Sequence, residues 1–483
     1  MLKHLIVAAF LAFTLPLCAQ TPGSCEDPVT FVKKLGSPQR PERAFSICAA
    51  SDGNVYLAGR QHNNPILSKI TPNGEPIWVR GFPSSSTEPL NLTEIIEDSE
   101  GNIVICGTQG LINNRRAVLM RYDPVKDTIL WYKHFAHEAI GVMEKNPGDN
   151  FILHAHNERV TNGVLTSSIY LIEFNRTTGT LVSGGLYTRL EGSPRMRFES
   201  MIKHQGSLYG AGGWQPGSQQ PLFAKISITD GNPEWAYITD PDTTTNEVAA
   251  SSHRDIVLDE DQFIITGSGH SDQGVFAYLE KHAADGSLLW MKRYDLPMQP
   301  EDVLVLPDAY FIYGKITDNT WGMIKTDKDG NLLQAKNLIT APMPAVPADY
   351  SSRQSQVLHV GNHLLMIDSD QTNTDNDIIL VKTDLDVNLD DSCSLLQQVP
   401  VNTLTLPAKI GQVTLIKPFY SQSGTSDVGV LFQQDALQVR KLCPQCPCID
   451  KPDITCHGEE IFCLPGDGPF VKVKICNLGQ VAP

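Results

Sequence analysis

Residues 52–59, DGNVYLAG, decide the fold, because the same pattern returns along the chain at a regular spacing. A turn precedes a short apolar strand that ends in Ala-Gly, and two further strands follow in ILSKI (66–70) and NGEPIW (73–78). The next copy contains DSEGNIVICG (98–107) and TILW (128–131). Glycine takes a positive φ without a Cβ clash, so the Asp-Gly and Asn-Gly pairs let consecutive strands reverse tightly. The unit is therefore a set of short antiparallel strands.

The spacing of the copies predicts the architecture. Trp78 and Trp131 are 53 residues apart, and Trp235 and Trp290 occupy the same repeat position further along the chain. A period of 45 to 55 residues in a turn-rich β pattern is typical of four-stranded propeller blades. The chain is thus predicted to be an all-β protein with a β-propeller of seven four-stranded blades. Because two copies are degenerate, six and eight blades stay open; the copies start near residues 44, 90, 139, 197, 253, 301 and 355.

The N-terminal part of the repeat region supplies a candidate closing strand. Residues 31–37 begin with FVKKLG, which is similar to the outer strand WVRGF at 78–82. The last copy, near 355–384, has only three strands of its own. We expect residues 31–37 to complete that blade, which would remove two exposed sheet edges.

The repeat unit resembles the β-propeller repeats of large secreted and surface proteins of bacteria that use type IX secretion. The unit consists of a turn, a strand ending in Ala-Gly or Cys-Gly, a strand ending in Lys or Arg, and Asp-Gly followed by Trp. The resemblance covers roughly residues 31–391. It implies a propeller and a surface or extracellular location, and it supplies no single activity.

The first residues have the layout of a secretory signal peptide. Lys3 precedes the apolar run 5–17, and the small residue Ala19 marks the expected cleavage site. The run is too short to span a membrane and Pro16 interrupts it. We therefore expect residues 1–19 to be removed, and the mature chain to be secreted or at the cell surface with no transmembrane segment. A net charge of −16 argues against nucleic acid as a partner.

Three segments follow the signal peptide. Residues 20–395 are predicted to form the propeller, and 396–442 a small β extension packed on the ring. Residues 443–483 are rich in cysteine, and their strand-like stretch 470–479 resembles the start of an adhesion-related immunoglobulin-like module. Such a sandwich needs about 100 residues. We therefore expect this module to be truncated and the chain to be a fragment of a longer protein.

The cysteines agree with export. Ten of the eleven remain after the signal peptide, and in an oxidising compartment disulfides are expected. Cysteines at the spacing of 443–448 could also converge on zinc, but structural pairing is the favoured interpretation. Cys48 and Cys106 lie within apolar strands and are expected to be buried. A disulfide between Cys25 and Cys393 would lock the ring. The disulfide candidates are Cys25, Cys393, Cys443, Cys446, Cys448, Cys456, Cys463 and Cys476.

Few other residues suggest chemistry. His154 and His156 share one face of a strand, which could start a metal site, but no third ligand is identifiable. Residues 384–390 space oxygen ligands like half of a calcium loop and lack its glycine and its final glutamate. The recurring tryptophans are expected in the core between blades, whereas Trp214 and Trp321 break that register and are the candidates for contacting a ligand. No catalytic residue, metal site or cofactor is assigned.

Three functions fit these observations. The first is a secreted or cell-surface, non-enzymatic binding or scaffolding propeller of a larger adhesin-like protein, whose partner is an unidentified protein or glycan. The second is an extracellular propeller enzyme, either glycan-active or a quinone-dependent dehydrogenase, since radial sheets with a central funnel also carry those chemistries. The third is a periplasmic assembly or sensor subunit that docks peptides.

Overall fold

Every regular element that the structure describes is a β-strand. The structure is a computed structural model of the 483-residue chain. It describes residues 30–36, 42–61, 64–82, 90–110, 115–135, 137–161, 164–182, 187–191, 196–214, 220–241, 248–271, 274–316, 320–338, 356–369, 377–389, 395–413, 415, 426–427, 433–434, 438–443, 459–462 and 471–474.

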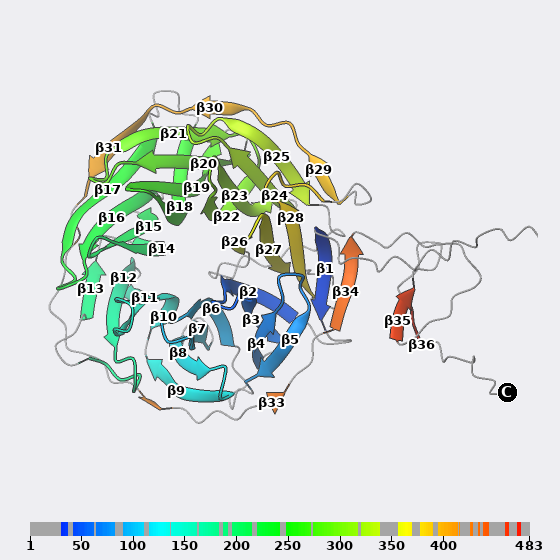
Figure 1. The fold of residues 1–483 in the computed structure, drawn as a ribbon. Helices are drawn as coiled ribbons and strands as arrows, with labels where there is room; N and C mark the ends of the chain where they lie inside the picture. Colours follow the sequence, from blue (N-terminus) through cyan, green and yellow to red (C-terminus); the bar gives the residue numbers. More distant parts are fainter. Residues whose placement is uncertain are drawn as a thin grey trace, which may run out of the picture. The chain divides into compact units, whose positions relative to one another are not determined.

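Seven antiparallel sheets form the blades of a β-propeller, as the repeat period predicts (Figure 1). Blade 1 contains β2 (Glu42–Ala49), β3 (Val55–Gln61), β4 (Asn64–Ile70) and β5 (Pro76–Gly81); blade 2, β6 (Leu90–Glu97), β7 (Ile103–Gln109), β8 (Arg116–Asp123) and β9 (Thr128–Phe135); and blade 3, β10 (Glu138–Glu144), β11 (Phe151–Thr161), β12 (Val164–Phe174) and β13 (Tyr187–Glu191).

The remaining blades have the same order of strands from the axis outward. Blade 4 contains β14 (Met196–His204), β15 (Ser207–Trp214), β16 (Gln220–Ser227) and β17 (Pro233–Pro241); blade 5, β18 (Val248–Asp259), β19 (Gln262–Ser271), β20 (Gly274–His282) and β21 (Leu288–Tyr294); blade 6, β22 (Met298–Val305), β23 (Tyr310–Ile316), β24 (Trp321–Thr326) and β25 (Leu332–Leu338); and blade 7, β26 (Gln356–Val360), β27 (His363–Ser369), β28 (Ile378–Asp384) and β1 (Phe31–Gly36).

Blade 7 joins the two ends of the repeat region. β1 pairs antiparallel with β28, with Phe31 opposite Lys382 and Leu35 opposite Ile378. The side chains of Phe31 and Leu35 are fully buried and pack with residues of blades 1 and 7. The N-terminal strand therefore closes the ring by completing a sheet whose other strands come from the end of the repeats.

A belt of short strands follows the blades and runs along their outer edges. It adds a fifth strand to six blades, in the order 6, 5, 4, 2, 1 and 7, which is opposite to the order of the blades in the chain (Figure 1). The described strands of this segment pack on the ring, because the free edges of the outer strands offer hydrogen bonds. The strands are β29 (Leu396–Gln398), β30 (Thr403–Thr405), β31 (Ala408–Gln412), β32 (Ser426–Asp427), β33 (Gln433–Gln434) and β34 (Gln438–Cys443).

The recurring tryptophans pack between blades. A Cβ placed on Gly286, in the turn of blade 5, would lie 2.7 Å from the ring of Trp235 in blade 4. A Cβ on Gly330 of blade 6 would lie 2.9 Å from the ring of Trp290 in blade 5. Both glycines also have a positive φ, so the turn and the packing each require glycine. The turn glycine of one blade therefore packs against the recurring tryptophan of the preceding blade.

A β-bulge recurs in the innermost strands and explains the glycine that ends the second strand of most repeats. In blade 2 the register shifts between Leu92 and Glu94, and Gly107 lies opposite Leu92. A Cβ on Gly107 would lie 2.5 Å from the carbonyl oxygen of Asn91, so the bulged backbone leaves no room for a side chain. The residues opposite the other bulges of the innermost strands are Gly59, Ala155, Gly212, Gly267 and Gly269 (β18 has two bulges), and Gly314.

The chain divides into two compact units. Residues 29–445 form the propeller with its belt, and residues 1–28 with 446–483 form the second unit. In the second unit the described strands are β35 (Glu459–Phe462) and β36 (Val471–Lys474), which pair antiparallel. The predicted signal peptide lies outside the described residues. Within the described part of the chain, no helix is long and apolar enough to cross a membrane.

Candidate functional site at the ring axis

A small pocket lies among the innermost strands of blades 2, 3, 4 and 7, and β11 of blade 3 adds one residue to its wall. It combines two carboxylates with apolar side chains, an imidazole and an amide. Consecutive inner strands contact one another around the ring, so this pocket lies at the axis, where propellers gather side chains from several blades. Its walls are Thr93, Glu94, Ile140, Gly141, Met143, His154, Glu199, Ser200, Met201 and Gln356.

Polar side chains of the innermost strands, most of them directly after a bulge, link six of the seven blades to the next blade. The Glu94 carboxylate accepts a hydrogen bond from the Val142 N–H of blade 3 at 2.7 Å, and Asp302 accepts one from Val357 of blade 7 at 2.8 Å. The Gln356 side-chain oxygen closes the circle by accepting from Ile47 of blade 1 at 2.7 Å. We call this set the polar collar; it comprises Ser46, Glu94, Ser200, Asp255, Asp302 and Gln356.

Blade 3 interrupts the collar and helps to form the pocket. Its residue after the bulge is Gly141, which has no side chain to extend toward blade 4. Glu94 fills part of this space, because a Cβ on Gly141 would collide with the Glu94 carboxylate. Ser200 of blade 4 instead donates to Asp255 of blade 5 at 2.7 Å. The pocket thus lies next to the blade in which glycine replaces the polar link.

One carboxylate of the pocket wall, Glu199, pairs with two arginines that do not line the pocket. The Glu199 carboxylate lies 3.1 Å from Arg197 Nε and 4.0 Å from Arg254 Nη1. Glu199 and Arg254 are bulge residues, so the same backbone irregularity that aims the collar side chains also brings this pair to the axis. The site therefore places two carboxyl side chains beside apolar ones.

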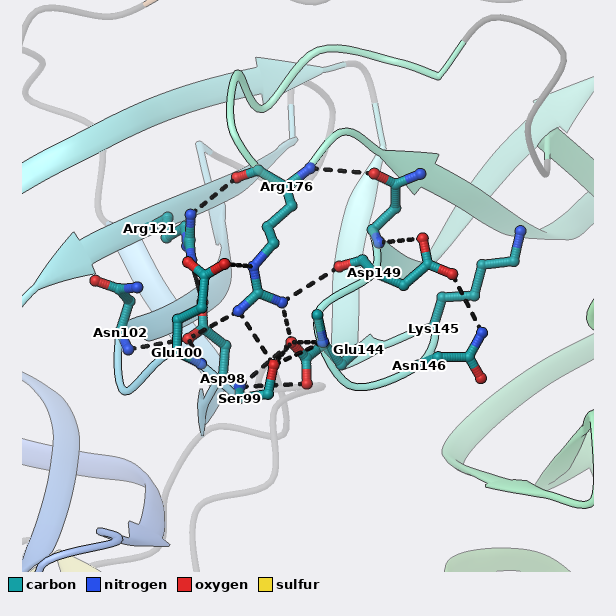
Figure 2. Close-up of polar contacts among 12 residues, drawn as sticks. Asp98, Ser99, Glu100, Asn102, Arg121, Glu144, Lys145, Asn146, Asp149 and Arg176 are labelled. Carbon is teal, nitrogen blue, oxygen red and sulfur yellow. Dashed lines mark hydrogen bonds and ion pairs between the residues drawn. The ribbon is translucent and has the colours of Figure 1, made fainter.

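A second polar cluster joins blades 2 and 3 away from the pocket (Figure 2). The Arg176 guanidinium lies 3.2 Å from Asp98, 3.1 Å from Glu100 and in contact with Glu144, and Arg121 donates to Asp98 at 2.8 Å. The hydrogen bond from Arg121 lowers the pKa of Glu100. Burial opposes ionisation of Glu144, but the hydrogen bonds from Arg176 and from Ser99 outweigh it and lower that pKa. These paired charges fasten adjacent turns.

A fully buried triad of titratable side chains lies between blades 4 and 5. Glu280 Oε2 is 3.0 Å from His253 Nε2 and 2.8 Å from His282 Nε2, and all three side chains have no exposed surface. The Nδ1 atoms face the carbonyl oxygens of Leu222 and Gly286, each at 3.0 Å. Carboxylate and carbonyl oxygens only accept, so both ring nitrogens of each imidazole face hydrogen-bond acceptors.

Burial alone would raise the pKa of Glu280, but the charge of His253 and the hydrogen bonds from both histidines lower it to about 2. Glu280 therefore stabilises the fold above pH ~4.5, its ordinary value, and this contribution is lost as pH falls toward 2. We expect the stability difference between the wild-type chain and Glu280→Gln to shrink by about 3 kcal/mol over that range. Urea unfolding of both chains at stepped pH measures it, and a constant difference would contradict the assignment.

The two predicted ligand-contacting tryptophans have different outcomes. Trp321 is only 2% exposed and stacks on Tyr313, with ring centroids 5.4 Å apart. It belongs to the core of blades 6 and 7, which argues against contact with a dissolved ligand. Its departure from the tryptophan register reflects a different core position, at the start of β24. Trp214 is the last residue of β15, and its side chain lies outside the described part.

The cysteine predictions are tested only in part. Cys106 is fully buried, which raises the pKa of its thiol. Cys48 is half-buried, and burial raises the pKa of its thiol to about 12. Of the disulfide candidates, Cys443 lies in β34 with its backbone opposite Val32. The others, and with them the pairing, lie outside the described residues: Cys25, Cys393, Cys446, Cys448, Cys456, Cys463 and Cys476.

The two weaker metal hypotheses gain no support. His154 and His156 are both 1% exposed, so they do not form an open strand surface, and His154 lines the pocket. In the acidic turn, Asp386 binds Lys325 at 2.6 Å, and Asn388 accepts from Lys336 at 2.8 Å. Among the described residues, no group of three or more His, Cys, Asp or Glu side chains is placed to hold a metal ion.

Sequence reasoning missed the collar and the triad. The collar position holds serine, glutamate, aspartate and glutamine in different blades, so no residue type recurs to mark it. Glu280 and His282 alternate on one strand, which puts them on the same face, and this was an available signal. Their partner His253 comes from another strand, 27 residues earlier, so only the fold brings the three together.

No protein-family model matches the chain, and no curated protein matches it by sequence. Three solved structures illustrate its structural similarities. A catalytically inactive virginiamycin B lyase from Staphylococcus aureus has 11% identity and a TM-score of 0.38, over 73% of this chain and 99% of that chain. Polysaccharide lyase Uly1 has 10% identity and a TM-score of 0.43, over 71% and 90%. Drosophila plexin A in complex with semaphorin 1b has 10% identity and a TM-score of 0.39, over 74% of this chain and 87% of that chain.

Proposed function

We propose that the chain is a secreted or cell-surface, non-enzymatic binding or scaffolding propeller within a larger adhesin-like protein. Its partner is a protein or a glycan. The signal-peptide layout supports export, and the cysteine-rich segment after the ring, similar to the start of an immunoglobulin-like module, supports attachment to further modules. Type IX secretion is the export route that the repeat resemblance suggests.

The polar collar is the observation that carries this proposal. Its carboxylates at the axis accept backbone hydrogen bonds from neighbouring blades, so they hold the ring together. A general acid at neutral pH needs a raised pKa. Each carboxyl group with a clear pKa shift in the described chain has that pKa lowered: Asp52, Glu100, Asp123, Asp127, Glu144, Asp149, Glu234, Asp259, Glu280, Asp285, Asp327 and Asp386.

The axial pocket favours one alternative, an extracellular glycan-active or quinone-dependent enzyme. Glu94, Glu199 and His154 line one space and could share acid and base roles. In that case Glu199→Gln would abolish turnover, whereas Glu234→Gln, a half-exposed carboxyl paired with Lys225 on an outer strand, would leave turnover unchanged.

The experiment is an array screen of the mature full-length chain against glycans and peptides, with quinone, metal and product analysis of the same sample. We expect saturable binding to one ligand class without a bound cofactor or product. A bound quinone or product formation that depends on Glu199 would overturn the proposal and make the pocket an active site.

A further inference from the structure

Where its burial is described, at residues 396–408, 410–413 and 415, the belt is much less buried than the blades. Its described strands are two to six residues long, and each pairs with a single outer strand. In β29 and β30 most positions are exposed, and Leu404 is 47% exposed. By contrast β3 is buried at six of its seven positions. Because buried apolar area supplies most of the stabilisation of a strand, the belt is held far less firmly than the blades it covers.

A few apolar contacts fasten the belt between its strands. Leu406 and Ala408 pack on the cluster of Phe276, Tyr278 and Met291 in blade 5. Leu415 is 7% exposed and packs on the core of blades 3 and 4. Leu396, Val399, Val401 and Val413 also pack on core clusters of the ring, so the belt is joined to the ring at successive points.

The last strand of the belt lies where the chain enters the ring. β34 pairs antiparallel with β1, with Cys443 opposite Val32 and Gln438 opposite Gly36. The end of the belt and the start of the ring therefore lie at the same end of this pair. Tension between the two ends of the chain pulls these strands apart sideways and loads one pair of hydrogen bonds at a time. Across β1, the pairing with β28 is backed by the buried side chains of Phe31 and Leu35.

We propose that residues 396–443 are a releasable belt, which tension on the C-terminal end unzips from blade 7 backward while the seven blades stay closed. Release frees up to 48 residues, which extend to about 160 Å at roughly 3.4 Å per residue. In a surface-tethered protein this would lengthen the connection to the next module without losing the ring. That role rests on the proposed surface location; the release itself does not.

Single-molecule pulling on the mature chain through its two ends tests the release. We expect a set of low-force steps that sum to the belt length, followed by higher-force steps from the blades. Hydrogen exchange without force gives a second measurement, in which amides of β29 to β34 exchange before those of the inner strands. Simultaneous loss of belt and blades, or release of blade residues first, would overturn the proposal.

A pinned belt provides the matched control. Lys292 and Thr405 face each other across β21 and β30, with Lys292 Nζ 2.9 Å from Thr405 Oγ1. A disulfide from Lys292→Cys with Thr405→Cys would leave only residues 406–443 releasable, about 130 Å. Lys292→Cys alone should release the full length. Equal low-force extension in the two variants would show that the steps do not come from the belt, whatever the result of the ligand screen.

Discussion

Replacing Glu280 by glutamine is expected to lower the free energy of unfolding by about 3–5 kcal/mol, because it removes the buried carboxylate that two buried histidines share. Glu280 Oε2 accepts from His253, His282 and the Thr239 hydroxyl, at 3.0, 2.8 and 3.1 Å. A glutamine oxygen at the Oε2 position would carry no charge, and the amide N–H groups would be buried at the Oε1 position, where Glu280 has no hydrogen-bond partner. Urea unfolding at neutral pH measures the loss.

Glu234→Gln is the matched control for this change. Glu234 is 38% exposed and pairs with Lys225 at 2.8 Å on the surface of the neighbouring blade. Exposed ion pairs contribute little, so we expect a loss below about 1 kcal/mol. Equal losses in the two variants would mean that the triad is not an ionised buried group.

Gly107→Ala is expected to cost about 2–4 kcal/mol through overpacking against backbone that cannot move freely. The new Cβ would lie 2.5 Å from the Asn91 oxygen and 3.0 Å from the Leu92 Cα. Relief requires the bulge to shift, and the bulge is what aims Glu94 at the Val142 N–H. We therefore expect faster hydrogen exchange of the Val142 amide together with a lower unfolding midpoint.

Gly101→Ala separates this effect from the general cost of replacing a glycine. Gly101 has a φ of 79°, and a Cβ there would meet no atom within 4 Å. The left-handed conformation alone should cost about 1 kcal/mol, with Val142 exchange unchanged. If Gly101→Ala were as damaging as Gly107→Ala, the explanation from the bulge would fail.

The repeat pattern predicts the blades because each blade is local in sequence. Turn glycines, strand-length apolar runs and recurring tryptophans lie within one unit of about 50 residues, so their spacing alone indicates the period and the fold class. Closure by residues 31–37 was also accessible, since β1 has the sequence character of an outer strand such as β5.

The belt and the axial site were not accessible in this way. Alternating residues in 396–442 predict strands, but strand pattern does not name a partner, and the partners turned out to be six different blades. Trp321 was expected near a ligand and lies in the core, because departure from a repeat register does not distinguish exposure from another buried position.

By itself the sequence determined that this protein is a ring of antiparallel blades, because hydrophobic period and turn chemistry act over a few residues. Only the tertiary structure decided which polar side chains meet. Glu94 reaches Val142, and Glu280 reaches Thr239, across blade boundaries, where the distance in space is unrelated to the distance along the chain. Contacts of this kind depend on how the bulges and blades pack. The pocket and the belt both consist of such contacts between several blades.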